Sequence, residues 1–176
     1  MVAVLQRGSQ PTQGQFHEAI ANRSDRWFSA CLRITHSPEL AEDAVQDALL
    51  TAWNKRHQFQ GDSSLETWIH RIAINAALQL IRKQRPGRFQ PLDDEVGESK
   101  DSPEHDAASH DFDTALSAAF RHLSEIERVC FVLRHLEQWK LREIADEMDT
   151  NEGRIKQALF RAVKKLRVKL KDMRSQ

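Results

Sequence analysis

Apolar residues recur along most of the chain at spacings of three and four positions, which is the periodicity of amphipathic helices. No stretch alternates apolar and polar residues, and only 6 glycines and 5 prolines are present, which disfavours a sheet-rich fold. The pattern therefore predicts an all-α protein. The expected helices span about residues 15–35, 38–55, 64–85, 112–122, 125–136, 141–148 and 153–171.

Local signals mark where several of these helices begin. Ser37 precedes a proline, which suits the first turn of a helix, so it is expected to cap the second helix. Ser63 with Glu66, and Ser124 with Glu127, have the spacing of capping boxes, in which each side chain bonds the other residue's backbone N–H. We therefore expect Ser63 and Ser124 to be helix caps.

An acidic segment separates two helical blocks. Residues 93–113 contain nine acidic residues and one lysine, a net charge of −8, which favours a solvated linker. Basic residues are in excess on both sides, with +3 over residues 57–92 and +5 over residues 140–176. The expected organisation is a disordered N-terminus (1–14), a first helical domain (15–85), a flexible acidic linker (86–111) and a second helical domain (112–172).

Several classes of function lack their usual signals. Cys31 and Cys130 form no CxxC pair, and no apolar stretch approaches the roughly 20 residues of a membrane span. The 8 histidines have no spacing typical of zinc or haem ligands. Paired carboxylates fall in the polar linker or on a helix face expected to be exposed, where nothing tunes a general acid. We expect a cytoplasmic protein that is not an enzyme and needs no metal or cofactor.

The last helix has a basic face opposite an apolar stripe, which consists of Ile155, Leu159, Ala162 and Leu166. With the short helix before it, it forms a helix-turn-helix pattern, whose second helix enters the DNA major groove. A solvated amphipathic helix is the simpler alternative, and Phe160 is expected to be partly exposed near the polar side. The candidate DNA-contacting residues are Arg154, Lys156, Gln157, Arg161 and Lys164.

The second helix is expected to bury Val45, Leu49, Ala52 and Trp53. Another of its faces combines acidic side chains with a leucine, which suits docking onto a basic and apolar protein surface. An ordinary acidic solvent face is the alternative. The candidate protein-contacting residues are Asp43, Gln46, Asp47, Leu50 and Asn54.

The third helix and the loop before it combine aromatic and small polar groups with arginines. This combination suits the capture of an unstacked base, although a core tryptophan flanked by solvated arginines would give the same pattern. The candidate residues are Phe59, Gln60, Gly61, Asp62, Ser63, Trp68, Arg71, Asn75, Arg82 and Lys83.

Together these segments resemble the extracytoplasmic-function (ECF) sigma factors, which contain only regions 2 and 4 of the sigma-70 superfamily. The segments AEDAVQD (41–47), AW (52–53), FQG (59–61), TWI (67–69) and RIAIN (71–75) are similar to region 2. The segments LS (123–124), VLR (132–134), EIA (143–145) and residues 153–166 are similar to region 4. The resemblance covers about residues 20–85 and 113–170.

The resemblance implies a role for each surface. The second-helix face would bind the β′ clamp helices of core RNA polymerase. The loop and third helix would capture flipped minus-ten bases, with Arg82 and Lys83 at phosphates. The last helix would read the minus-thirty-five duplex while its domain lies on the β flap. An anti-sigma factor is a further implied partner, and the free protein would be a monomer without membrane insertion.

Some positions depart from the family pattern. An acidic residue is common at Gln79, Ser or Thr at Lys140, and Gly at Asp149, so the cap and turn of the helix-turn-helix differ from the usual ones. The recognition helix also carries unusual residues, so the resemblance does not predict the promoter sequence. These residues are Arg154, Gln157 and Ala158.

Two other interpretations stay open. An autonomous helix-turn-helix regulator, with residues 15–85 as a sensor or dimerisation domain, predicts a dimer that binds DNA tightly without polymerase. A protein-interaction adaptor predicts no DNA contribution from Arg154 or Arg161. A separate hypothesis is that the acidic linker folds back and masks the recognition helix, although an extended tether is simpler.

Overall fold

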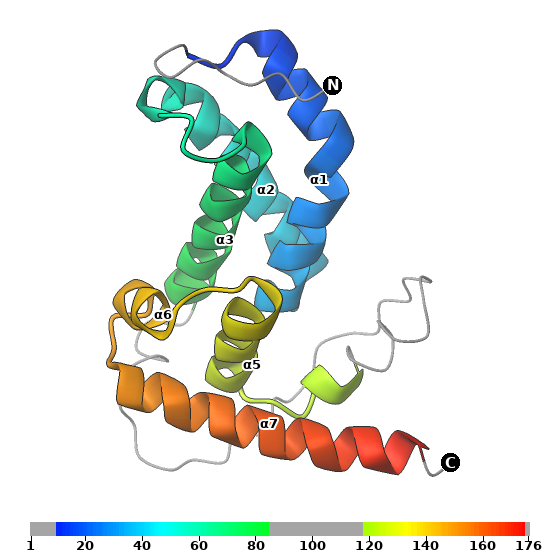
Figure 1. Ribbon diagram of the computed structural model, residues 1–176. Helices are drawn as coiled ribbons and strands as arrows, with labels where there is room; N and C mark the ends of the chain where they lie inside the picture. The colour runs from blue at the N-terminus through cyan, green and yellow to red at the C-terminus, as the bar shows by residue number, and fades with distance from the viewer. Residues whose placement is uncertain (1–9, 85–117, 175–176) are drawn as a thin grey trace. The chain divides into compact units, whose positions relative to one another are not determined.

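The computed structural model describes residues 10–84 and 118–174, and the regular elements within these residues are all helical (Figure 1). The all-α prediction is therefore confirmed. The chain divides into two compact units, with the division after Gln84. The predicted acidic linker lies outside the described residues, and so does the hypothesis that it masks the recognition helix. Most of the helix predicted at 112–122 also lies outside them, although residues 118–120 are helical. None of the helices in these described ranges has the length and apolar character needed to cross a membrane.

Three long helices and a short 3-10 helix form the N-terminal unit, and each long helix packs against the other two (Figure 1). The elements are α1 (Gln13–Thr35), α2 (Pro38–Asn54), η1 (Arg56–Gln58) and α3 (Leu65–Gln84).

The seam of α2 against its neighbours is made of small side chains. Ala41, Ala44, Ala48 and Ala52 are all buried, whereas Val45 and Leu49 of the predicted core face are only half-buried. Methyl side chains allow the backbone of α2 to approach α1 and α3 closely. The large core residues come from those two helices, which contribute Trp27, Ile34, Ile69, Ile74 and Leu78.

Helix α1 begins two residues earlier than predicted, so the expected disorder of residues 1–14 is wrong for its last positions. The Gln15 N–H donates to Thr12 Oγ1 (3.3 Å), and the Thr12 N–H donates to Gln15 Oε1 (2.8 Å). This reciprocal capping box fixes the helix start at Gln13. The predicted cap of α2 is confirmed, since Ser37 Oγ accepts the Leu40 N–H (3.3 Å).

The cap of α3 is one residue later than predicted. Ser64 Oγ accepts the Thr67 N–H at 3.2 Å and lies 3.0 Å from the Thr67 hydroxyl. Ser63 instead donates its hydroxyl to the Ser64 carbonyl (3.3 Å). The shift places Glu66 at the second helical position, from which a capping box is not made.

In the C-terminal unit, α5 and α6 pack against the long helix α7 (Figure 1). Their buried residues include Val129, Leu133, Ile144, Ile155 and Ala162. The elements are α5 (Glu125–Phe131), the π-helical turn η2 (Val132–Leu136), α6 (Leu141–Glu147) and α7 (Glu152–Arg174).

The helix predicted at 125–136 widens into a π turn over its last five residues, which the apolar periodicity did not predict. The Glu137 N–H donates to the Val132 carbonyl (3.0 Å), and Gln138 then adopts a left-handed conformation with φ 61°. The Arg134 guanidinium donates to the Trp139 carbonyl (2.9 Å). Together these bonds end the helix and direct the Trp139 side chain into the core.

Helices α6 and α7 with the short turn between them form the predicted helix-turn-helix. Asp149 adopts φ 49°, the left-handed conformation that glycine usually supplies at such a turn. Asn151 caps α7, because its Oδ1 accepts the Arg154 N–H (2.9 Å). Lys140 supplies no side-chain acceptor to α6, but Glu143 Oε2 accepts the Lys140 N–H (2.8 Å) and so retains half of a capping box.

Candidate protein and nucleic-acid interfaces

The buried side of α7 is rotated slightly from the predicted stripe. Ile155, Ala162 and Leu166 are buried as expected, but Ala158 is buried where Leu159 was predicted, and Leu159 is half-buried. The small Ala158 side chain lets the helix turn this edge toward the core.

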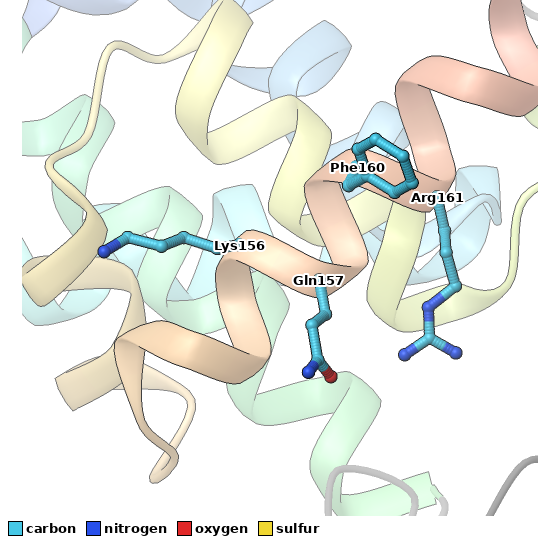
Figure 2. Close-up of a pocket in the computed structure, with 4 residues that line it drawn as sticks. All are labelled: Lys156, Gln157, Phe160 and Arg161. Atoms are coloured by element: carbon cyan, nitrogen blue, oxygen red, sulfur yellow. The ribbon is translucent and has the colours of Figure 1, made fainter.

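The opposite side of α7 is open to solvent along the predicted DNA-contacting positions. Lys156, Gln157, Arg161 and Lys164 are exposed, whereas Arg154 is half-buried. Four residues line an open hollow of about 380 Å³, in which Gln157 and Arg161 extend in the same direction and Lys156 extends away from them (Figure 2). The fourth is Phe160, which is 72% exposed, well beyond the partial exposure expected for it.

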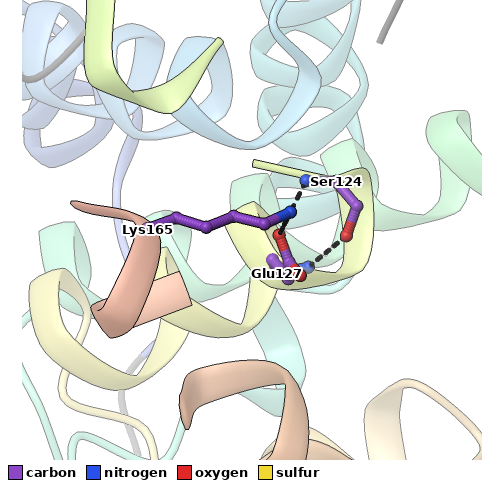
Figure 3. Close-up of polar contacts among 3 residues, drawn as sticks. All are labelled: Ser124, Glu127 and Lys165. Atoms are coloured by element: carbon purple, nitrogen blue, oxygen red, sulfur yellow. Dashed lines mark hydrogen bonds and ion pairs between the residues drawn. The ribbon is translucent and has the colours of Figure 1, made fainter. Parts of the chain in front are cut away.

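An ion pair with a buried carboxylate and a partly exposed lysine holds α7 against the start of α5. Lys165 Nζ lies 2.8 Å from Glu127 Oε2, and Glu127 is buried (Figure 3). The same carboxylate oxygen accepts the Ser124 N–H (3.0 Å), while Ser124 Oγ accepts the Glu127 N–H (3.4 Å), so the predicted capping box is confirmed. One carboxylate therefore both starts α5 and orients the helix that carries the basic face.

The face of α2 predicted to bind protein is exposed at all five of its candidate positions, and Leu50 is 65% exposed. Trp53, predicted to be core, is 37% exposed. Its ring and that of Phe16 form a T-shaped pair with centroids 5.1 Å apart, and the Arg56 guanidinium lies over the Trp53 ring at 4.2 Å. Arg56 also donates to the Trp53 carbonyl (2.7 Å), so this tryptophan lies at the edge of the core, in contact with the buried Phe16 and the half-buried Arg56. The five exposed candidates are Asp43, Gln46, Asp47, Leu50 and Asn54.

A shallow groove of about 200 Å³ joins this face to α3. Thr51, Gln79 and Leu80 were not among the predicted contact residues, and the groove brings them together with Asp47 and Lys83. On each helix the lining residues follow the spacing i, i+3, i+4, i+7, a signal that a search for paired helix faces would have found. The lining comprises Asp47, Leu50, Thr51 and Asn54 from α2 and Ala76, Gln79, Leu80 and Lys83 from α3.

The predicted base-capturing loop is exposed, except for its aromatic residue. Gln60, Gly61, Asp62 and Ser63 face solvent, and Gly61 has φ 75°, which glycine adopts without strain. Phe59 is 6% exposed and packs against Trp68 with ring centroids 5.4 Å apart. The ring of Phe59 is therefore part of the packing beneath the loop, and the exposed surface of the loop is formed by the polar residues that follow it.

The remaining candidates lie along α3. Arg71 and Lys83 are exposed, and Trp68, Asn75 and Arg82 are half-buried. Within the described residues, Oδ1 of Asn75 is shielded from solvent and has no hydrogen-bond partner. Such an acceptor is rare in folded proteins, because nearly all buried polar groups have a hydrogen-bond partner.

Comparison with known proteins identifies the family. Residues 21–86 match the family model Sigma-70 region 2, and residues 113–166 match Sigma-70, region 4. The chain is 35% identical over 156 residues to the ECF RNA polymerase sigma factor SigG of Mycobacterium tuberculosis. The chain belongs to the ECF group of the sigma-70 family. The match covers 75% of this ECF family member but only 42% of SigG, so the chain spans less than half the length of that relative.

Other ECF sigma factors align over nearly the whole chain. The ECF RNA polymerase sigma-E factor of Haemophilus influenzae is 24% identical, with 97% of this chain and 95% of the relative covered. SigW of Bacillus subtilis is 25% identical, with 92% and 91% covered.

Two solved structures have the same fold. The sigma factor RpoE from Bartonella quintana, in complex with the anti-sigma factor NepR, aligns with a TM-score of 0.57 and 26% identity over 89% of this chain and 96% of RpoE. CnrH, in complex with the cytosolic domain of CnrY, aligns with a TM-score of 0.54 and 19% identity over 92% of this chain and 90% of CnrH. The second likeness concerns the fold alone.

The region 4 unit of this ECF family member also contains a buried cysteine. Burial raises the pKa of the Cys130 thiol from 9.0 to about 12, against a smaller opposing effect of Arg154, and Glu127 adds to the rise. The Cys130 thiol donates a weak hydrogen bond to the Met148 sulfur at 3.9 Å. A thiol held protonated in this way is a poor nucleophile and metal ligand. No group of three or more metal-binding side chains occurs in the parts of the chain that the structure describes.

Proposed function

We propose that this protein is a sigma factor that binds core RNA polymerase and directs promoter-specific initiation of transcription. The observation that carries the proposal is that regions 2 and 4 follow one another in this order. The two helical units expose an acidic and apolar face on α2, which suits a protein partner, and a basic face on α7, which suits DNA. It acts by binding rather than by catalysis, in the cytoplasm where bacterial polymerase works.

The exposed α2 face is the proposed contact with the β′ clamp helices. Asp43 and Asp47 supply negative charge beside the exposed Leu50, a combination that suits a partner with basic and apolar side chains. The buried alanines beneath this face hold α2 close to the core. We therefore expect the face to bind its partner without a change in the backbone of α2.

The loop at residues 60–63 and the adjoining α3 face are the proposed site for the minus-ten element. Phe59 supports the loop from below, and Arg71 and Asn75 offer polar contacts beside it. Unstacking a base costs a few kcal/mol, which contacts in this site would offset, so strand opening needs no catalytic group. Arg82 and Lys83 would neutralise backbone phosphates further along α3.

The basic face of α7 is proposed to read the minus-thirty-five element in duplex form, with its unit on the β flap. Gln157 and Arg161 lie in the first half of the helix, where a recognition helix meets base edges. We also propose an anti-sigma factor as a partner, because RpoE is similar to this chain and is bound to one.

The first test is binding to bacterial core RNA polymerase, followed by size-exclusion chromatography. The full chain should co-elute with the core enzyme, and the Asp43→Lys/Asp47→Lys variant should not. Glu18→Lys/Asp25→Lys is the matched control, because it makes the same change in net charge at exposed positions of α1. The control should co-elute as the wild type does.

The outcomes separate the proposal from its alternatives. Co-elution of both double variants would keep the sigma-factor proposal but remove the assignment of the α2 face. Absence of co-elution for the wild type, with a dimer that binds duplex DNA unaided, would favour an autonomous regulator. Run-off transcription from a promoter library, with and without the chain, then tests whether initiation depends on it.

A further inference from the structure

Phe160 is the most exposed of the large hydrophobic residues in the described part of the chain, at 72%. It lies on the solvent side of α7, away from the buried residues Ile155 and Ala162. The hollow beside it is lined by Gln157 and Arg161 together with Lys156 (Figure 2). An aromatic ring that lines the same open hollow as an amide and a guanidinium suits a ligand with both apolar and polar edges.

The polar groups around Phe160 are available for binding. Within the described residues, the side chains of Gln157 and Arg161 make no hydrogen bond or ion pair. Lys156 differs, because its Nζ lies 3.9 Å from Glu152 Oε2 one turn earlier. Among the described residues, neither the Gln157 nor the Arg161 side chain has a partner to lose when a ligand contacts the hollow.

The charge of α7 indicates the class of ligand. Residues 152–174 contain nine lysines and arginines and two acidic residues. The positive charge of such a helix is complementary to the phosphates of a duplex. The major groove of duplex DNA is wide enough to admit an α-helix.

The major groove presents a partner for each group at the hollow. Glutamine bonds adenine through N6 and N7, arginine bonds guanine through O6 and N7, and apolar side chains pack against the thymine methyl group. Gln157 and Arg161 are separated by about 6 Å along the helix axis, at 1.5 Å per residue, which spans about two base-pair steps. Phe160 lies between them in sequence, so all three can meet neighbouring base pairs.

We propose that Phe160 is a specificity-determining residue that packs against a thymine methyl group in the upstream duplex element. Gln157 reads an adenine at the same or the adjoining base pair, and Arg161 reads a guanine one or two steps away. This inference rests on the proposed function, since it assigns the base preference of the same α7 face.

The test begins with holoenzyme assembled from core polymerase and the full chain. A duplex library with a randomised upstream region is selected for binding, and the enriched sequence is measured by sequencing. Each thymine of that sequence is then replaced singly by uracil, which removes the methyl group and keeps every hydrogen bond. Binding is compared by fluorescence anisotropy for the wild type, Phe160→Ala and the control Val168→Ala, which truncates another exposed apolar residue of α7.

At one thymine, uracil should weaken wild-type and Val168→Ala binding by about 3- to 5-fold, the size expected for one buried methyl group. Phe160→Ala should bind more weakly and should no longer distinguish thymine from uracil. Selection with Gln157→Ala should lose the preference for adenine beside that thymine.

Three results would overturn the inference, and they differ in what they leave standing. Equal sensitivity to uracil in the wild type and Phe160→Ala, or none at any thymine, would remove the role of Phe160 while an enriched sequence retained the proposed function. Loss of co-elution with core polymerase in Phe160→Ala would place the ring on a protein contact. Enrichment of no sequence by the wild-type holoenzyme would overturn both proposals.

Discussion

The ammonium group of Lys165 lies 2.8 Å from Oε2 of Glu127, whose side chain is almost completely shielded from solvent. The carboxylate also accepts the backbone N–H of Ser124, so it joins the start of α5 to the middle of α7. The basic helix thus depends for its orientation on a residue outside the helix-turn-helix.

Replacing Lys165 by methionine should destabilise the C-terminal unit by about 1–3 kcal/mol, because Glu127 would stay buried without its cation. The lysine is partly exposed, which limits the effect. Urea unfolding of the full chain, followed by circular dichroism, measures the change. Lys164→Met, at an exposed neighbouring position, should unfold like the wild type. Equal stability of the two variants would show that the ion pair contributes nothing.

Replacing Ser64 by alanine should lower the free energy of unfolding by about 1 kcal/mol, since α3 would lose its N-terminal cap. Ser63→Ala should change it by less than about 0.5 kcal/mol, because Ser63 only donates to a neighbouring carbonyl. The pair is best compared by thermal unfolding. A larger loss in Ser63→Ala would assign the cap to the residue expected from the sequence.

Asn75→Ala should weaken promoter opening without lowering the thermal stability of the protein. The unpartnered Oδ1 contributes no internal hydrogen bond, so its removal should leave the thermal midpoint unchanged or slightly higher. Promoter opening should weaken by about 10-fold if Asn75 hydrogen-bonds a flipped base, as loss of about 1.4 kcal/mol would produce. Permanganate footprinting of unpaired thymines measures opening. A clear fall in the midpoint would instead show that Asn75 stabilises the fold.

Cys130 should make the stability of the C-terminal unit depend on alkaline pH. Its pKa is about 12 in the folded protein and 9.0 in the absence of burial, so the unfolded chain releases the thiol proton first. The contribution is fully present below pH 9.0 and should be lost as pH rises from 9.0 towards about 12, by about 1.4 kcal/mol per pH unit. Subtracting the unfolding profile of Cys130→Ala removes the titration of lysines. A difference that did not vary with pH would contradict the shift.

Features encoded by neighbouring residues were the ones that the sequence predicted well. The caps at Ser37 and Ser124 depend on residues within three positions, and three of the four residues predicted for the α7 stripe are buried as the helical period implies. The cap of α3 was misplaced because adjacent serines at 63 and 64 offer the same chemistry. Only the geometry of the loop selects between them.

Features that depend on tertiary contacts were predicted less well. No local pattern predicted that Phe59 is buried, because that burial depends on Trp68, nine residues later in the chain. The position of Trp53 depends likewise on Phe16, far earlier in the chain. The groove between α2 and α3 needs two helices at once, so no single periodic segment could predict it.

The alanine seam of α2 separates two kinds of change that this helix can undergo. A larger side chain at Ala44 or Ala48 would push the helix away from its neighbours, at a cost of about 1–3 kcal/mol. Substitutions on the outer face touch none of these methyl groups. Substitutions on the outer face can therefore change which partner α2 binds without moving the helix. Partner recognition and folding are thus determined by separate sets of residues on this one helix.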